Sequence, residues 1–250
     1  MNDLYYTFIK PEKALADFVE SFGMFHLKSA EAKEVVIIPD GKVDLFFLRS
    51  GSKPFQVLLT GLETEPKQRS MAPDTFFFDI NFKPLGVEYI LQTTIADVVN
   101  SAKYLPDDFL NFSSTDLIDF EAFSKKAANI IKMLLPKEID FRKQKLFELI
   151  YASNGEIAIQ ELSERIGWSS RQINRYFKSR FGMSLKAYCN ILRFRKSLNH
   201  IAHGKISPEL NFTDQNHFIK QIKKFSGVVP TELSKNQNDR FVLLSVLKQQ

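Results

Sequence analysis

Four polar side chains near residue 175 have the spacing to share one face of a helix and to contact DNA there. They lie at i, i+3, i+4 and i+7, and they are Arg171, Asn174, Arg175 and Lys178. Arginine can donate two parallel hydrogen bonds to guanine O6 and N7, asparagine can pair with adenine, and lysine neutralises phosphate. The set therefore suits a DNA major groove, although an ordinary surface helix can carry the same charges.

The element that holds these residues is predicted to be the second helix of a helix-turn-helix. Its inward positions repeat every four residues, at Ile173, Phe177 and Phe181. Ser169 or Ser170 can cap the start of this helix, and Gly182 can end it. A short helix over 158–166 and a turn at Gly167-Trp168 come before it. This order of helix, glycine turn and basic helix is typical of helix-turn-helix proteins.

The same pattern recurs 45 residues further along the chain. Its inward positions and final glycine are Phe218, Ile222 and Gly227, its outward positions are Asn216, Ile219, Lys220 and Lys223, and Thr213 or Asp214 can cap it. Between the two copies, 185–202 predicts a longer helix with two apolar stripes. One stripe is Leu185, Tyr188, Cys189 and Leu192, and the other is Ile191, Phe194, Leu198 and Ile201. A helix that is apolar on two sides is packed on two sides, so we expect a strut between two small helical bundles.

With both copies in place, residues from about 145 to 234 resemble the AraC/XylS family of bacterial transcription regulators. The resemblance rests on ordered segments at 159–163, 167–171, 177–182, 192–196, 211–218, 223–225 and 227–232. It implies two helix-turn-helix subdomains that enter successive major grooves on one face of the duplex. It also implies base-reading positions, which are Arg171, Asn174 and Arg175 in the first subdomain and Gln215, Asn216 and Lys220 in the second. Ser170, Lys178 and Lys223 complete the residues expected to contact DNA.

The second copy departs from the family pattern before its turn. Only 205–211 separate Gly204 from Phe212, which is shorter than the family pattern, and Pro208 further limits helix there. The usual glycine is Asn211, which can still adopt a left-handed conformation. We therefore expect a truncated scaffold helix in the second subdomain. Because Ile219 offers no hydrogen bond, the first subdomain is expected to supply most sequence discrimination while the second mainly grips phosphate.

The first 135 residues carry a different pattern, typical of antiparallel strands. Short runs rich in β-branched and aromatic residues alternate with turn signals such as Pro39-Asp40-Gly41. The predicted strands are 35–38, 43–48, 55–59, 75–80 and 87–91, and the predicted helices are 11–22, 95–105 and 119–135. The sequence thus predicts an α+β multidomain protein. Its β-rich N-terminal barrel or sandwich, with flanking helices, precedes an all-α C-terminal double helix-turn-helix domain.

Three segments of this half, 15–20, 38–45 and 82–87, resemble a poorly characterised domain often found ahead of AraC-type DNA-binding domains. We interpret this half as a sensor or dimerisation module. The 39–41 stretch is interpreted as a turn, with contact to a ligand as the alternative. The helix over 119–135 is interpreted as packing on its own domain, with pairing in a dimer as the alternative.

Charge divides the chain at the same place. Residues 1–135 hold 14 Lys or Arg and 19 Asp or Glu, whereas residues 136–250 hold 20 and 10, so the net charges are −5 and +10. A basic half favours a polyanionic partner, although it can also be a solvated surface. No apolar run reaches the roughly 18 residues of a membrane span, and residues 1–10 lack a secretion signal. A cytoplasmic location is therefore expected.

Catalytic and metal-binding patterns are missing from the sequence. The lone Cys189 lies in an apolar stripe and is expected to pack as a small hydrophobe. His200 and His203 have an i, i+3 spacing that metal sites use, but no nearby carboxylate or cysteine completes a ligand set. The 76–78 phenylalanine run is interpreted as a buried strand rather than a cofactor pocket. The stretch 240–248 is either a short amphipathic helix or a frayed tail.

Three regions follow from these patterns: a sensor or dimerisation domain at 1–135, a DNA-binding domain at 136–235 and a tail at 236–250. The predicted function is that of a sequence-specific DNA-binding transcription regulator, with no enzyme activity, cofactor or metal. The expected partner is double-stranded DNA. RNA polymerase, a small-molecule effector on the N-terminal domain and a second copy of the chain are further candidates. The alternative is a protein-interaction module on a degenerate helix-turn-helix scaffold. The basic face around Arg171 favours the regulator.

Overall fold

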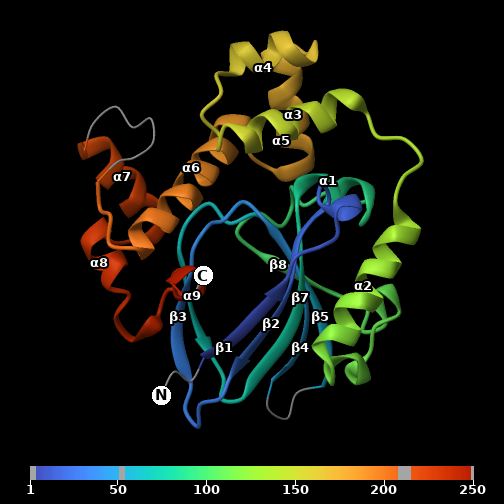
Figure 1. The fold of residues 1–250 in the computed structure, drawn as a ribbon, viewed down its shortest axis with the longest axis vertical. Coiled ribbons are helices and arrows are strands. Elements are labelled where there is room, and N and C mark those ends of the chain that lie inside the picture. Colours follow the sequence, from blue (N-terminus) through green and yellow to red (C-terminus); the bar gives the residue numbers. More distant parts are fainter. Residues whose placement is uncertain (1–3, 51–53, 208–214, 249–250) are drawn as a thin grey trace. The chain divides into compact units, whose positions relative to one another are not determined.

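The computed structural model describes residues 4–50, 54–207 and 215–248 and resolves them into two compact units (Figure 1). The sheet unit consists of residues 1–33, 42–62 and 70–139, and the helical unit of residues 34–41, 63–69 and 140–250. Two short segments of the N-terminal sequence thus belong to the helical unit. In the parts of the chain that the structure describes, no helix is both long and apolar enough to cross a membrane.

The sheet unit is built on an open six-stranded sheet in the order β1-β2-β7-β4-β5-β8. Its strands are β1 (Leu4–Ile9), β2 (Val19–Leu27), β4 (Val43–Ser50), β5 (Gln56–Thr60), β7 (Thr75–Phe82) and β8 (Ala102–Leu105). The pairs β1–β2, β2–β7, β4–β7, β4–β5 and β5–β8 are all antiparallel. Within the described residues the two edge strands do not close on each other, so a barrel is not formed. The open sheet leaves the sandwich alternative. A second, two-stranded sheet pairs β3 (Lys33–Ile37) with β6 (Lys67–Met71), and most of its residues belong to the helical unit.

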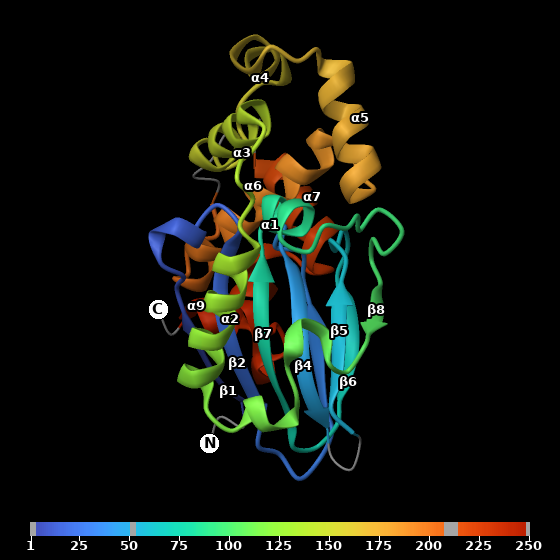
Figure 2. The same ribbon diagram turned by 90° about the vertical axis from the view of Figure 1, so that its right-hand side faces the viewer.

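The core of the sheet unit lies between the sheet and helix α2 (Phe120–Leu134), which runs alongside the strands in Figure 2. Asp119 caps this helix by accepting a hydrogen bond from the Ala122 N–H. Phe123 points into the core, with its ring centroid 5.3 Å from Phe47 and 5.0 Å from Phe78. The predicted helix over 119–135 is therefore confirmed, and it packs on its own sheet.

A bulge in β2 accounts for an incorrect helix prediction over 11–22. The chain there forms only a 3-10 turn, Lys13–Leu15, and then the strand. The pairing of β2 with β7 shifts between Val19 and Ser21, which places Val19 and Phe22 on the buried side although they are three residues apart. That spacing imitates the period of a helix.

Two further elements of the sheet unit were assigned incorrectly from the sequence. The expected strand over 87–91 is part of helix α1 (Pro84–Tyr89), in which Pro84 occupies the first turn, where its missing N–H costs nothing. The expected helix over 95–105 ends instead in the edge strand β8, whose residues alternate between exposed and half-buried. The remaining short turns of the unit are η2 (Phe109–Asn111) and η3 (Ser114–Leu117).

The helical unit follows the sequence prediction closely. It contains α3 (Phe141–Ala152), α4 (Ile159–Ile166), α5 (Ser170–Phe181), α6 (Leu185–Ala202), α7 (Gln215–Ser226), α8 (Pro230–Lys235), η4 (Gln237–Asp239) and α9 (Val242–Lys248). Helix α6 runs from the α3–α5 group to α7 and α8 (Figure 1), and both of its predicted apolar stripes are buried. It is therefore the expected strut. The stretch 240–248 resolves as the amphipathic alternative, with Phe241, Leu244 and Leu247 buried.

The 34–41 segment is attached to the rest of the helical unit through specific contacts of its backbone. The Val36 N–H donates to the Arg240 carbonyl at 2.6 Å, and Val36 forms a parallel bridge with Phe241. The buried Tyr188 hydroxyl donates to the Gly41 carbonyl at 3.1 Å. Gly41 has a φ of +80°, and a Cβ there would lie 3.1 Å from a Leu192 methyl group. The Pro39-Asp40-Gly41 turn is thus fitted closely against α6.

Candidate nucleic-acid interface

The turn between α4 and α5 is fixed by local hydrogen bonds. Gly167 ends α4 in a left-handed conformation with a φ of +68°, which favours glycine. The Ser163 hydroxyl donates to the Trp168 carbonyl across the turn. Ser169 then caps α5: its hydroxyl accepts from the Gln172 N–H, and the Gln172 side chain accepts from the Ser169 N–H at 2.8 Å. This reciprocal capping box sets where α5 begins and which side it turns outward.

The inward face of α5 is anchored by an aromatic cluster. Ile173, Phe177 and Phe181 are all buried, as predicted. The Phe147 ring of α3 lies 5.7 Å from Phe177 and 6.1 Å from Phe181, measured between ring centroids. Because both the cap and this cluster fix the rotation of α5, the direction of its outward face is set by the fold.

The outward face of α5 presents cationic side chains to solvent. Ser170, Arg171, Arg175 and Lys178 are exposed, and the Lys178 ammonium group donates to the Gly182 carbonyl at 2.9 Å. Asn174 differs from its neighbours because it is half-buried and its amide is engaged within the protein. Its Nδ2 donates to the Ser170 carbonyl at 3.0 Å, and its Oδ1 accepts from the Leu185 N–H at 3.3 Å.

The second copy reproduces the first with the same 45-residue shift. Helix α7 begins and ends 45 residues after α5, and α8 begins 45 residues after α6. Gly182 and Gly227, at the ends of α5 and α7, have φ values of +73° and +81°. The inward Phe218 and Ile222 are buried, Ile219 is half-buried like Asn174, and the outward residues Gln215, Asn216, Lys220 and Lys223 are exposed.

Part of the second copy lies outside the described residues. This part includes the predicted caps Thr213 and Asp214, together with Pro208 and Asn211 of the shortened stretch. The end of α6 is described: it stops at Ala202, and Gly204 follows with a φ of +80°. The truncated scaffold helix therefore stays a prediction.

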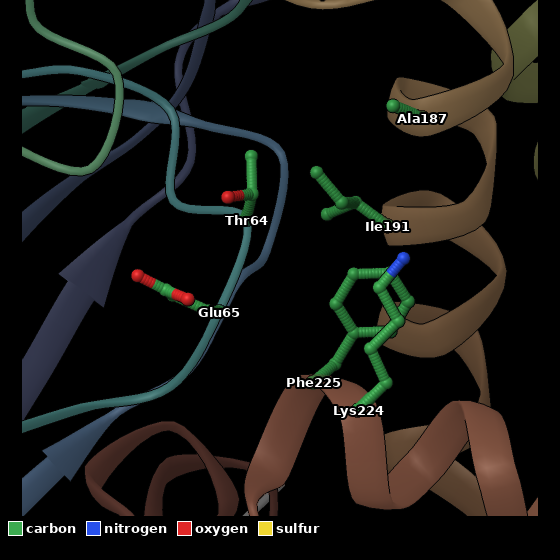
Figure 3. A pocket seen from close by; sticks show the side chains of 6 residues that line it. All are labelled: Thr64, Glu65, Ala187, Ile191, Lys224 and Phe225. Atoms are coloured by element: carbon green, nitrogen blue, oxygen red, sulfur yellow. The ribbon is translucent and has the colours of Figure 1, made fainter.

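A small cavity within the helical unit was not predicted from the sequence. Its volume is about 270 Å³, and it is lined by Thr64, Glu65, Ala187, Ile191, Lys224 and Phe225. Figure 3 shows Ile191 and Lys224 extending from the helices, while the Glu65 carboxylate turns away from α6. Two of its walls are α6 and α7, and the third is the 63–69 segment. No sequence pattern signals that this distant segment lies there.

Cys189 and His203, which were considered for thiol chemistry and metal binding, make contacts within the fold instead. Cys189 is buried, and burial raises the pKa of its thiol to about 12, although Arg193 opposes that shift. His203 Nδ1 lies 2.7 Å from the Asn199 carbonyl, which is a helical i−4 contact. Among the described residues, no three His, Cys, Asp or Glu side chains form a group that could hold a metal ion.

Comparison with known proteins agrees with both halves of this description. Residues 162–236 match a family described as a helix-turn-helix domain, and residues 7–103 match a domain of unknown function, DUF6597. No curated protein sequence matches the chain.

Solved structures of ToxT from Vibrio cholerae share the fold at low sequence identity. One is 11% identical with a TM-score of 0.52, covering 86% of this chain and 98% of ToxT. Another, bound to (E)-4-(8-methylnaphthalen-1-yl)but-3-enoic acid, is 11% identical with a TM-score of 0.51, covering 89% and 99%. The chain thus carries an AraC-type helix-turn-helix domain, preceded by a domain of unknown function.

Proposed function

We propose that this chain is a sequence-specific transcription regulator of the cytoplasm whose helices α5 and α7 enter successive major grooves of DNA. The observation that carries the proposal is the duplicated surface. Helices α5 and α7 have the same length, and a glycine follows each of them. Each helix buries apolar residues at the same positions and exposes polar and cationic residues at the others. An ordinary solvent-exposed helix is not expected to recur 45 residues later with the same pattern of buried and exposed positions.

The two copies carry different chemistry. Helix α5 exposes Arg171 and Arg175, which can each read a guanine through two hydrogen bonds, and Lys178, which can neutralise a phosphate. Helix α7 exposes Gln215, Asn216, Lys220 and Lys223, but Ile219 occupies the position between them. We therefore assign most base discrimination to α5 and mainly phosphate contacts to α7.

The cavity between α6, α7 and the 63–69 segment is the proposed effector site. The ToxT structure with a bound carboxylic acid supports an effector of this class. Lys224 can pair with a carboxylate, while Ile191 and Phe225 offer apolar contact. A ligand in this place touches the second reading helix directly. RNA polymerase and a second copy of the chain are further partners that a regulator of this kind would use.

Selection from a random duplex library with the purified full-length chain tests the proposal. We expect one sequence to be enriched, and its affinity to fall as salt rises because phosphate contacts release counterions. Arg175→Ala should cost about 1–3 kcal/mol on that sequence and relax the preference at one base pair. Arg49→Ala, which removes an exposed arginine from strand β4, is the matched control and should leave the preference unchanged. Failure to enrich any sequence, with or without the carboxylic acid, would favour the protein-interaction alternative.

A further inference from the structure

The Asn174 side chain supplies a hydrogen bond that α6 needs at its first turn. The first N–H groups of a helix have no partner within that helix. The Ser184 hydroxyl caps α6 by accepting from the Ala187 N–H at 3.2 Å. The Leu185 N–H, the first of the helix, is instead accepted by Asn174 Oδ1 from α5. Because Leu185 is fully buried, this donor has no ready substitute in water.

The internal repeat shows what happens when this bond is absent. The 45-residue shift carries Asn174 to Ile219 and Leu185 to Pro230. Isoleucine has no acceptor, and proline has no N–H to donate. Pro230 stands at the first position of α8, where a missing N–H costs nothing. Both halves of the hydrogen bond are therefore replaced together, and no buried donor is left without a partner.

The direction of the Asn174 amide also opposes base reading. An asparagine that pairs with adenine accepts from N6 and donates to N7 with the same amide edge. Here the oxygen of that edge points to the Leu185 N–H, and the nitrogen donates to the Ser170 carbonyl. Reading an adenine with this edge would therefore compete with the bond to the Leu185 N–H, which already engages the amide oxygen.

We propose that Asn174 is a positioning residue, which ties the reading helix α5 to the first turn of α6 and does not itself contact a base. The proposal rests on the DNA-binding function proposed above. It leaves base discrimination in α5 to Arg171 and Arg175, whose side chains are exposed.

A double-mutant cycle on the full-length chain tests the bond, because the second repeat shows which pair of residues can replace it. Asn174→Ile alone leaves the Leu185 N–H without a partner, and we expect it to weaken affinity for the selected duplex about tenfold. In a Leu185→Pro background the same change removes no hydrogen bond to residue 185 and leaves only the local bond to the Ser170 carbonyl to lose, so we expect less than about a twofold effect. An equal loss in both backgrounds would overturn the proposal, since base reading by Asn174 does not depend on residue 185.

Asn174→Asp gives a second test that separates positioning from reading. The carboxylate can still accept from the Leu185 N–H, and the positive end of the α6 dipole favours it there. It cannot donate to adenine N7. We expect a lower, salt-dependent affinity but the same enriched sequence as the native chain. A changed preference at one base pair would refute the assignment. If instead Arg175→Ala leaves the enriched sequence unaltered, the DNA-reading role of α5 fails, which is a different result.

Discussion

Tyr188→Phe is the most informative single change to the helical unit, because it deletes one oxygen atom from a buried junction. The Tyr188 hydroxyl donates its one proton to the Gly41 carbonyl at 3.1 Å. The Tyr151 hydroxyl, 3.0 Å away, must then donate to Tyr188. Phenylalanine fills the same space and removes both bonds. The change therefore tests the attachment of the 34–41 segment without creating a large cavity.

The expected cost follows from what each partner loses. The Gly41 carbonyl is buried and would lose the Tyr188 hydroxyl as its donor. An unsatisfied buried polar group costs about 1–3 kcal/mol. Tyr151 is half-buried, so water can replace its lost acceptor. We expect Tyr188→Phe to lower the free energy of unfolding by about 2 kcal/mol. For a chain of this size the melting temperature should fall by roughly 4–8 °C.

Tyr151→Phe is the matched control, because it removes a hydroxyl from the same pair but leaves the bond to Gly41 in place. Its cost should stay below about 1 kcal/mol. Urea unfolding measures both variants, and hydrogen exchange of residues 34–41 should rise only in Tyr188→Phe. Equal costs for the two variants, or unchanged exchange at 34–41, would refute the reasoning.

Two further substitutions and one labelling experiment test other parts of the molecule. Burial raises the pKa of Glu20, but ion pairs with Lys42 and Lys10 outweigh it and bring the pKa to about 2. The native chain should therefore have a higher free energy of unfolding in urea than Glu20→Gln at pH 7. The difference should vanish as the pH falls from about 4.5 towards 2, because the ion pairs stabilise the folded chain only while the Glu20 carboxylate is ionised. A constant difference across that range would contradict the ion pairs. Cys189, with a buried thiol of pKa about 12, should resist a maleimide at pH 8 in the folded chain and react once urea unfolds it; rapid labelling of the folded chain would contradict the packing. Phe123→Ala should cost about 3–5 kcal/mol in urea unfolding, because its ring lies in the core under α2, and a cost under about 1 kcal/mol would show that α2 is not anchored there.

The helices of the DNA-binding half could be predicted almost to the residue, because local signals agreed. The bounds of 185–202 match the structure and those of 158–166 differ from it by one residue, since apolar residues recur with the period of a helix along each segment. The repeat also located both outward faces. The evidence for these faces was the chemical type of the residues and their spacing, and neither requires knowledge of contacts with distant parts of the chain.

The strands of the sheet unit were harder to predict, because tertiary pairing decides them. Strand β6 reads Lys-Gln-Arg-Ser-Met and has no apolar alternation that could reveal it. Strand β2 showed a helical period because of its bulge. The bonds of the Asn174 amide were equally invisible, since residue type and spacing do not show whether a polar side chain faces solvent or a neighbouring helix.

The discontinuous make-up of the helical unit limits how freely this regulator could exchange parts with others. A chimaera that carries only residues 140–250 would leave the Tyr188 hydroxyl without the Gly41 carbonyl and the Arg240 carbonyl without the Val36 N–H. The transferable module is instead three pieces, two of them interspersed among the strands of the sheet unit. Recombination at a single crossover point cannot move them together. The two halves of the chain are therefore expected to be inherited as one cassette, even though their motifs look separable in the sequence.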